Sequence, residues 1–69
     1  MEFFIGDKVT LLSPMTYLKT AENMPMLRPP DLISPQEVGE VVGIRPNNFL
    51  EVRFRRGTFL LPIEKIKKE

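Results

Sequence analysis

In LEVRFRRGTFLL, residues 50–61, apolar and charged side chains alternate up to a turn. Leu50, Val52 and Phe54 fall on one face of an extended chain, and the opposite face carries Glu51, Arg53 and Arg55. This period of two is typical of a strand with one buried face and one solvated face. The stretch therefore predicts an antiparallel hairpin whose apolar face packs on a core.

The turn of this hairpin leaves the register open. Arg56-Gly57 is the reversal signal, and a two-residue turn there would place Phe54 opposite Phe59 and Val52 opposite Leu61. If Gly57 is instead the left-handed residue of a bulged turn, the register moves by one. The sequence does not choose between these pairings.

Further strands are predicted on both sides of the hairpin. Phe3–Leu12 carries apolar residues at odd positions around a Gly6-Asp7 bend, which indicates a strand entered through a tight turn. Val38–Ile44 is rich in valine, its two glycines suggest a bulge, and Arg45–Asn48 predicts a turn.

The end of the chain has a different pattern. Pro62–Ile66 is typical of a single 3₁₀ turn that leads to a last short strand or tail. Lys67–Glu69 is charged and terminal, so we expect it to fray.

Residues 13–36 break the strand pattern, because they hold five of the seven prolines. The best helix candidate in this stretch, Tyr17–Asn23, is followed at once by Pro25. We therefore expect a long loop that packs across the domain through its apolar side chains. The sequence predicts one all-β domain over residues 1–69, an SH3-like small barrel of about five strands with this long Pro/Met-rich loop between the first two strands.

Composition excludes most catalytic chemistry. The 69 residues include no Cys and no His, and the nine carboxylates show no paired or nucleophile-plus-base arrangement. We therefore expect a protein that is not an enzyme and uses no metal or cofactor. The apolar runs are short and the start lacks a signal-peptide pattern, which predicts a cytoplasmic protein with no direct membrane insertion.

Arg53, Arg55 and Arg56 form the first candidate site, since they project from the outward face and tip of the hairpin. Three guanidinium groups there would lie within reach of one acidic partner or phosphate. The alternative is a solvated strand face that blunts a sheet edge. The outward neighbours of these arginines are Glu51, Thr58 and Leu60, which offer no aromatic stacking platform, so nucleic acid is not expected as a partner.

The Met/Pro-rich part of the loop, Met24–Pro30, is the second candidate site. Methionine adapts to a partner surface and proline lowers the entropy lost on binding. Met24, Met26 and Leu27 either face outward as an interface or cap an open end of the barrel. The other candidate binding residues in this region are Tyr17, Lys19 and Arg28.

Several strings in the chain resemble the SipA family of small cyanobacterial NblS-interacting proteins. They are residues 17–21 (YLKTA), 24–32 (MPMLRPPDL), 38–41 (VGEV) and 52–61 (VRFRRGTFLL). The resemblance implies an SH3-like regulator, expected to be a monomer when free. It would bind the ATP-binding kinase region of the sensor histidine kinase NblS and stimulate its autophosphorylation in stress and high-light signalling. An alternative expectation is a docking subunit for an acidic electron carrier such as ferredoxin, which would use the arginines and leave the Met/Pro loop unexplained.

Overall fold

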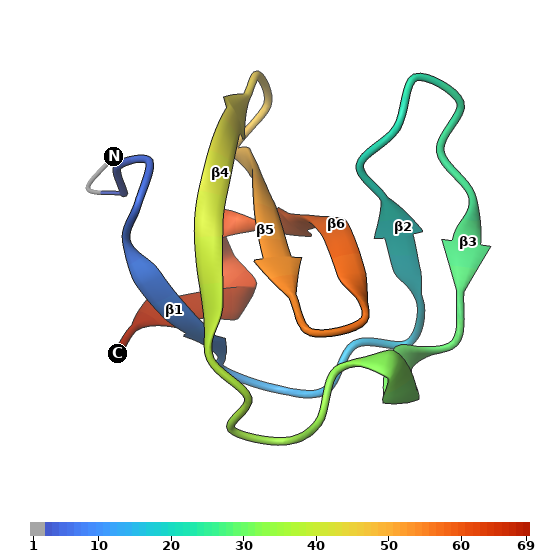
Figure 1. Ribbon diagram of the computed structural model, residues 1–69, viewed down its shortest axis with the longest axis horizontal. Helices are drawn as coiled ribbons and strands as arrows, with labels where there is room; N and C mark the ends of the chain where they lie inside the picture. The colour runs from blue at the N-terminus through green and yellow to red at the C-terminus, as the bar shows by residue number, and fades with distance from the viewer. Residues whose placement is uncertain (1–2) are drawn as a thin grey trace.

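The computed structural model describes residues 3–69, so the first two residues of the predicted 1–69 domain lie outside the described part. Within that part the chain forms seven strands, two 3₁₀ turns and no α-helix (Figure 1). The elements are β1 (Lys8–Leu11), β2 (Leu18–Thr20), β3 (Leu27–Arg28), η1 (Pro30–Leu32), β4 (Gly39–Arg45), β5 (Phe49–Phe54), β6 (Gly57–Pro62), η2 (Ile63–Lys65) and β7 (Ile66–Lys68).

The seven strands make one antiparallel sheet in the order β3-β2-β6-β5-β4-β1-β7. Its inner face supplies a single core, formed by Val9, Leu18, Ile33, Val41, Leu50, Val52, Phe54, Phe59, Leu61 and Ile66. Because six of the seven strands contribute to that core, the sheet must curl around its own inner face. The prediction of an all-β small barrel is confirmed, with seven strands where about five were expected.

The predicted bends and turns fall close to their expected places. Gly6 has a φ of +99° and its N–H donates to the carbonyl of Val41, so the first strand begins only at Lys8 and not at residue 3. The β4–β5 register shifts between Val41 and Gly43, which is the predicted bulge. Asn47 and Asn48 both have positive φ, as the turn between these strands requires.

The β5–β6 register is neither of the two predicted ones. Val52 lies opposite Phe59 and Phe54 lies opposite Gly57, so the turn residues are Arg55 and Arg56. Gly57 has a φ of +148°, and a Cβ there would lie 3.2 Å from the Phe59 ring, so glycine lets this ring pack over the end of the hairpin. A shift of two residues preserves the face of every side chain, which is why the predicted burial is right although the pairing is wrong.

The predicted loop 13–36 is also wrong in part, because it contains β2, β3 and η1. Leu18 and Thr20 are buried and flank the exposed Lys19, an alternation too short to stand out in the sequence. The strand β2 is stabilised by pairing with β6, where Lys19 lies opposite Leu60. A three-residue strand needs such a neighbour, and this one is distant in the chain.

The C-terminus does not fray as expected. Lys67 and Lys68 belong to β7, which pairs with β1, and the N–H of Glu69 donates to the carbonyl of Lys8 at 2.9 Å. The buried Ile66 anchors this strand, and β1 offers it an otherwise open edge. Backbone pairing therefore orders a segment that charge and position alone predict to be loose.

Candidate protein interface

Most of the candidate residues lie in or next to the β2–β3 hairpin, and all of these are exposed. Met24 is 83% exposed and Leu27 is 66% exposed, so the alternative in which they cap the barrel does not hold. Leu18 in β2 and Ile33 after η1 are the residues of this part of the chain that belong to the buried core. We call the exposed set the hairpin surface: Tyr17, Lys19, Met24, Met26 and Leu27.

Backbone contacts fix the shape of this hairpin. The N–H of Thr20 donates to the carbonyl of Met26 at 2.9 Å, and the N–H of Met26 donates to the Thr20 hydroxyl at 2.8 Å. Thr20 is itself buried, and the N–H of Ala21 donates to the carbonyl of Thr58 in β6. The exposed apolar side chains are therefore presented by an ordered scaffold.

The open edge of β3 offers little to a strand from another chain. The N–H and carbonyl of Met26 both bond to Thr20 in β2. Because successive residues of a strand direct these groups to alternate sides, the N–H and carbonyl of Leu27 point away from β2, to the open edge. The next outward positions are Pro25 and Pro29, which have no N–H. A partner at this edge must therefore be recognised mainly through side chains.

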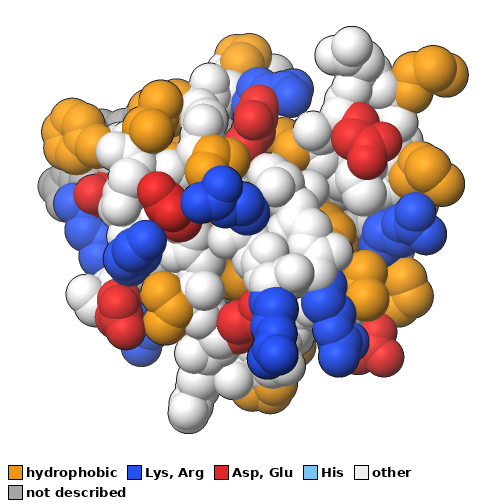
Figure 2. All heavy atoms as spheres, viewed as in Figure 1, with side chains coloured by type: hydrophobic (Ala, Val, Ile, Leu, Met, Phe, Trp, Pro, Cys, Tyr) orange, Lys and Arg blue, Asp and Glu red, His pale blue; other side chains and the backbone are white. Residues whose placement is uncertain are grey.

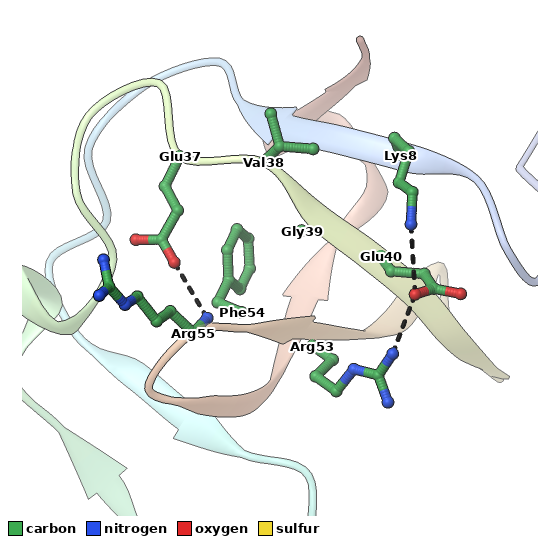
Figure 3. Close-up of a pocket in the computed structure, with 8 residues that line it drawn as sticks. All are labelled: Lys8, Glu37, Val38, Gly39, Glu40, Arg53, Phe54 and Arg55. Atoms are coloured by element: carbon green, nitrogen blue, oxygen red, sulfur yellow. Dashed lines mark hydrogen bonds and ion pairs between the residues drawn. The ribbon is translucent and has the colours of Figure 1, made fainter.

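Arg53 is engaged in a cluster of ion pairs with other residues of the same chain (Figure 3). Glu40 lies opposite Arg53 in the β4–β5 ladder and opposite Lys8 in the β1–β4 ladder. Its carboxylate accepts from Arg53 Nη2 at 2.9 Å and from Lys8 Nζ at 3.3 Å. The hydrogen bond and charge of Lys8, followed by those of Arg53, hold the pKa of Glu40 below its ordinary value.

Glu37 fastens the turn before β4 to the tip of the β5–β6 hairpin (Figure 3). One carboxylate oxygen accepts from the N–H of Ser34 at 2.9 Å and the other from the N–H of Arg55 at 3.0 Å. Sequence reasoning missed this residue, although Ser34-Pro35-Gln36-Glu37 has the S-x-x-E spacing of a capping box. Glu40 was missed because its link to Arg53 requires the strand register.

The pKa of Glu37 lies below its ordinary value of 4.5, chiefly because of the Ser34 hydrogen bond and then the Arg55 hydrogen bond. A carboxylate whose pKa is lower in the folded state than in the unfolded state stabilises the fold at pH values above its unfolded-state pKa. That stabilisation is lost as the pH falls through the folded-state pKa. We expect Glu37→Ala to lower the free energy of unfolding by about 1 kcal/mol at pH 7, the usual effect of losing a cap. The difference from wild type should shrink below pH 4.5, as measured by urea unfolding at both pH values.

Glu64→Ala is the matched control for this prediction, because Glu64 is an exposed carboxylate in η2. It should leave the free energy of unfolding close to that of wild type at neutral pH. Equal effects of the two variants would contradict a specific role for Glu37.

The three arginines of the hairpin are divided between two hollows. Arg53 and Arg55 line one of about 490 Å³ with Lys8, Glu37, Val38, Gly39, Glu40 and Phe54. Arg56 lies instead with Arg28 beside a second hollow of about 400 Å³, which we call the arginine hollow. Figure 2 shows Lys and Arg side chains as separate groups around the β5–β6 turn and beside β3. Arg28 and Arg56 therefore line one hollow, and Arg53 lines the other.

Residues 3–69 contain no group of three or more His, Cys, Asp or Glu side chains placed to hold a metal ion. No helix in the same range is long and apolar enough to cross a bilayer.

Comparisons with known proteins give a family for this chain. The sequence model of the family described as Protein CHLORORESPIRATORY REDUCTION 42-like matches residues 5–66. Protein CHLORORESPIRATORY REDUCTION 42, chloroplastic, from Arabidopsis thaliana is 34% identical over 58 residues, which cover 83% of this chain and 48% of the relative. The chain thus spans about half the length of that relative. No solved structure matched the chain.

These findings overturn the resemblance to the SipA family, and with it the expected regulation of the histidine kinase NblS in cyanobacterial stress signalling. They give no support to the alternative of a ferredoxin-docking subunit. The strings that suggested SipA lie in β2, β3, β4 and the β5–β6 hairpin, so they consist largely of residues that a small barrel needs to fold. The expected cytoplasmic location is not confirmed, since the relative is chloroplastic. The match over residues 5–66 shows that this chain belongs to the CHLORORESPIRATORY REDUCTION 42-like family.

Proposed function

We propose that this chain is a non-catalytic protein-binding module that serves the process for which its Arabidopsis relative is named, chlororespiratory reduction. The observation that carries the proposal is the exposure of Met24, Met26 and Leu27 on an ordered hairpin. Met26 is hydrogen-bonded to Thr20 and Leu27 lies opposite Lys19, so these side chains flank the open edge of the hairpin from its two faces, and exposed apolar side chains close to one another in this way are typical of protein contact sites. The partner is a protein that covers this hairpin surface.

The chemistry of the hairpin surface supports such a role. Methionine side chains conform to a partner, and prolines on either side of β3 restrict the free chain, so less entropy is lost on binding. Lys19 and Tyr17 add a charge and an amphipathic ring at the border, where interfaces are usually polar.

The rest of the molecule supports a role without catalysis. The chain has neither His nor Cys, and Glu37 and Glu40 are engaged in hydrogen bonds that hold the fold. For location, we propose an aqueous compartment: the cytoplasm, or the chloroplast interior in a cell that has chloroplasts, as the name of the relative suggests.

A chimera tests the proposal. In an Arabidopsis line that lacks the relative, the segment of the relative that matches this chain is replaced by this chain, with the remainder kept. We expect the chimera to restore chlororespiratory reduction. Met26→Asp plus Leu27→Asp should abolish the restoration, because two desolvated carboxylates would weaken the contact by roughly tenfold or more.

The matched control for the chimera is Ile5→Asp plus Ile44→Asp, which places the same charges at exposed apolar sites away from the hairpin surface. Circular dichroism and thermal unfolding of the isolated chain establish that both double variants fold. Restoration by the Met26/Leu27 variant, or its loss in both variants, would overturn the proposed role of the hairpin surface.

A further inference from the structure

The arginine hollow lies next to the hairpin surface, at the end of the barrel between β3 and the β5–β6 turn. Arg28 and Arg56 line it together with the apolar residues Pro29, Leu32 and Phe59. Arg28 reaches it because its position in β3 is opposite the buried Leu18, on the inward side of the hairpin. Arg56 reaches it from the β5–β6 turn, which the observed register places at residues 55–56.

The ion pairs of the molecule leave these two arginines free to contact a partner, although the charge of Arg56 also acts on Glu37 and helps to lower the pKa of that carboxylate. Among the residues that the structure describes, the ion pairs engage Lys8, Arg45, Arg53 and Lys68 with Asp7, Glu40 and Glu51. Neither Arg28 nor Arg56 takes part in any of them. Glu22 is the one carboxylate that lines the hollow, so this surface carries an excess of positive charge.

We propose that the arginine hollow binds a Glu or Asp side chain of the protein partner that covers the hairpin surface. The partner then carries an acidic residue beside the apolar residue that contacts Met26, which lies on the same face of β3 as Arg28. Two guanidinium groups recognise a carboxylate through charge-assisted hydrogen bonds, and the apolar lining accommodates the aliphatic part of its side chain. This inference rests on the proposed function, since it assumes a protein partner at the hairpin.

The surroundings favour an acidic protein segment over other anions. Nucleic acid binding uses aromatic rings for stacking, and the ring that lines this hollow, Phe59, is 2% exposed. The net charge of +1 provides no general attraction for a polyanion or an anionic membrane. The apolar hairpin surface alongside matches a protein segment that mixes acidic and apolar residues.

Nuclear magnetic resonance titration with a synthetic probe tests this inference. The probe is the capped peptide Gly-Leu-Glu-Leu-Glu-Gly, and its counterpart carries glutamine in place of glutamate. We expect the acidic peptide to shift the amide signals of Arg28, Gly57 and Thr58, with binding that weakens as salt is added. Arg28→Gln plus Arg56→Gln should reduce the affinity by roughly tenfold or more, as expected for the loss of charged hydrogen bonds.

Arg45→Gln plus Arg53→Gln is the matched control, because both of these arginines are engaged within the chain. It should leave the peptide affinity unchanged. The inference is overturned if the peptide does not bind, if the glutamine peptide binds equally well, or if the control weakens binding as much. It is also overturned if an oligonucleotide or a vesicle of anionic lipid displaces the peptide from these residues.

The two tests fail separately. Loss of chimera function in the Met26/Leu27 variant, together with no effect of Arg28 and Arg56 on peptide binding, would keep the hairpin interface and remove the acidic contact. Peptide binding that depends on Arg28 and Arg56, with full function of the Met26/Leu27 chimera, would keep the acidic contact and overturn the hairpin surface as the working interface.

Discussion

Phe59→Ala is expected to leave the chain unfolded at 25 °C. Phe59 is 2% exposed and is the largest of the fully buried side chains. It lies opposite Val52 in β5 and opposite Thr20 in β2, so it joins the central hairpin to the β2–β3 hairpin. Truncating a buried Phe to Ala costs about 3–5 kcal/mol, which is about what the single core of such a small domain supplies.

The measurement for this variant is the amide spectrum and the far-ultraviolet circular dichroism, because the chain has no Trp and a single Tyr. Phe49→Ala is the matched control: Phe49 lies in the neighbouring strand β5, is 37% exposed and should cost less than about 1 kcal/mol. Dispersed amide signals from the Phe59 variant would show that the core tolerates the loss and that Phe59 does not join the two hairpins.

Gly39→Ala should be the second most damaging change. Gly39 is buried in β4, and a Cβ there would lie 2.7 Å from both Val52 Cγ1 and Phe54 Cε1. Both neighbours belong to the core, so neither can move without displacing others. We expect a loss of about 1–3 kcal/mol in the free energy of unfolding, the usual cost of overpacking, measured by urea denaturation.

Gly43→Ala supplies the comparison within the same strand. Its Cβ would also meet an atom at 2.7 Å, but that atom is the carboxylate oxygen of Glu51, the end of a flexible side chain. The expected change is therefore well below that of Gly39→Ala. If the two variants unfold at the same urea concentration, the packing of Val52 and Phe54 against Gly39 is not what constrains this position.

Local patterns predicted most of the strands because their causes are local. The alternation of Leu50, Val52 and Phe54 gave the buried face of β5, and the glycines of residues 38–44 indicated the bulge in β4. The strands β2 and β3 were missed because three or two residues carry too little periodicity. Their stability depends on pairing with β6, which is distant in the chain, and the sequence does not show which segment pairs with it.

The function was mistaken for a related physical reason. The strings that suggested the SipA family consist largely of turns and strands that many small barrels use. Met24, Met26 and Leu27, which lie within one of these strings, do not by themselves indicate which partner they contact. Agreement over the whole domain, residues 5–66, identified the family. Short strings chosen for their conspicuous residues pointed to the wrong family.

Residue types and a period of two are enough to predict the all-β class, the buried face of the central hairpin and a chemistry without imidazole or thiol groups. The exposure of Met24, Met26 and Leu27, the ion pair of Glu40 with Arg53, and the hollow lined by both Arg28 and Arg56 came from the three-dimensional arrangement alone. Each of these outcomes depends on which strands lie side by side and in which register. Long-range packing sets that register, here through Phe59 over Gly57, and no local pattern contains it.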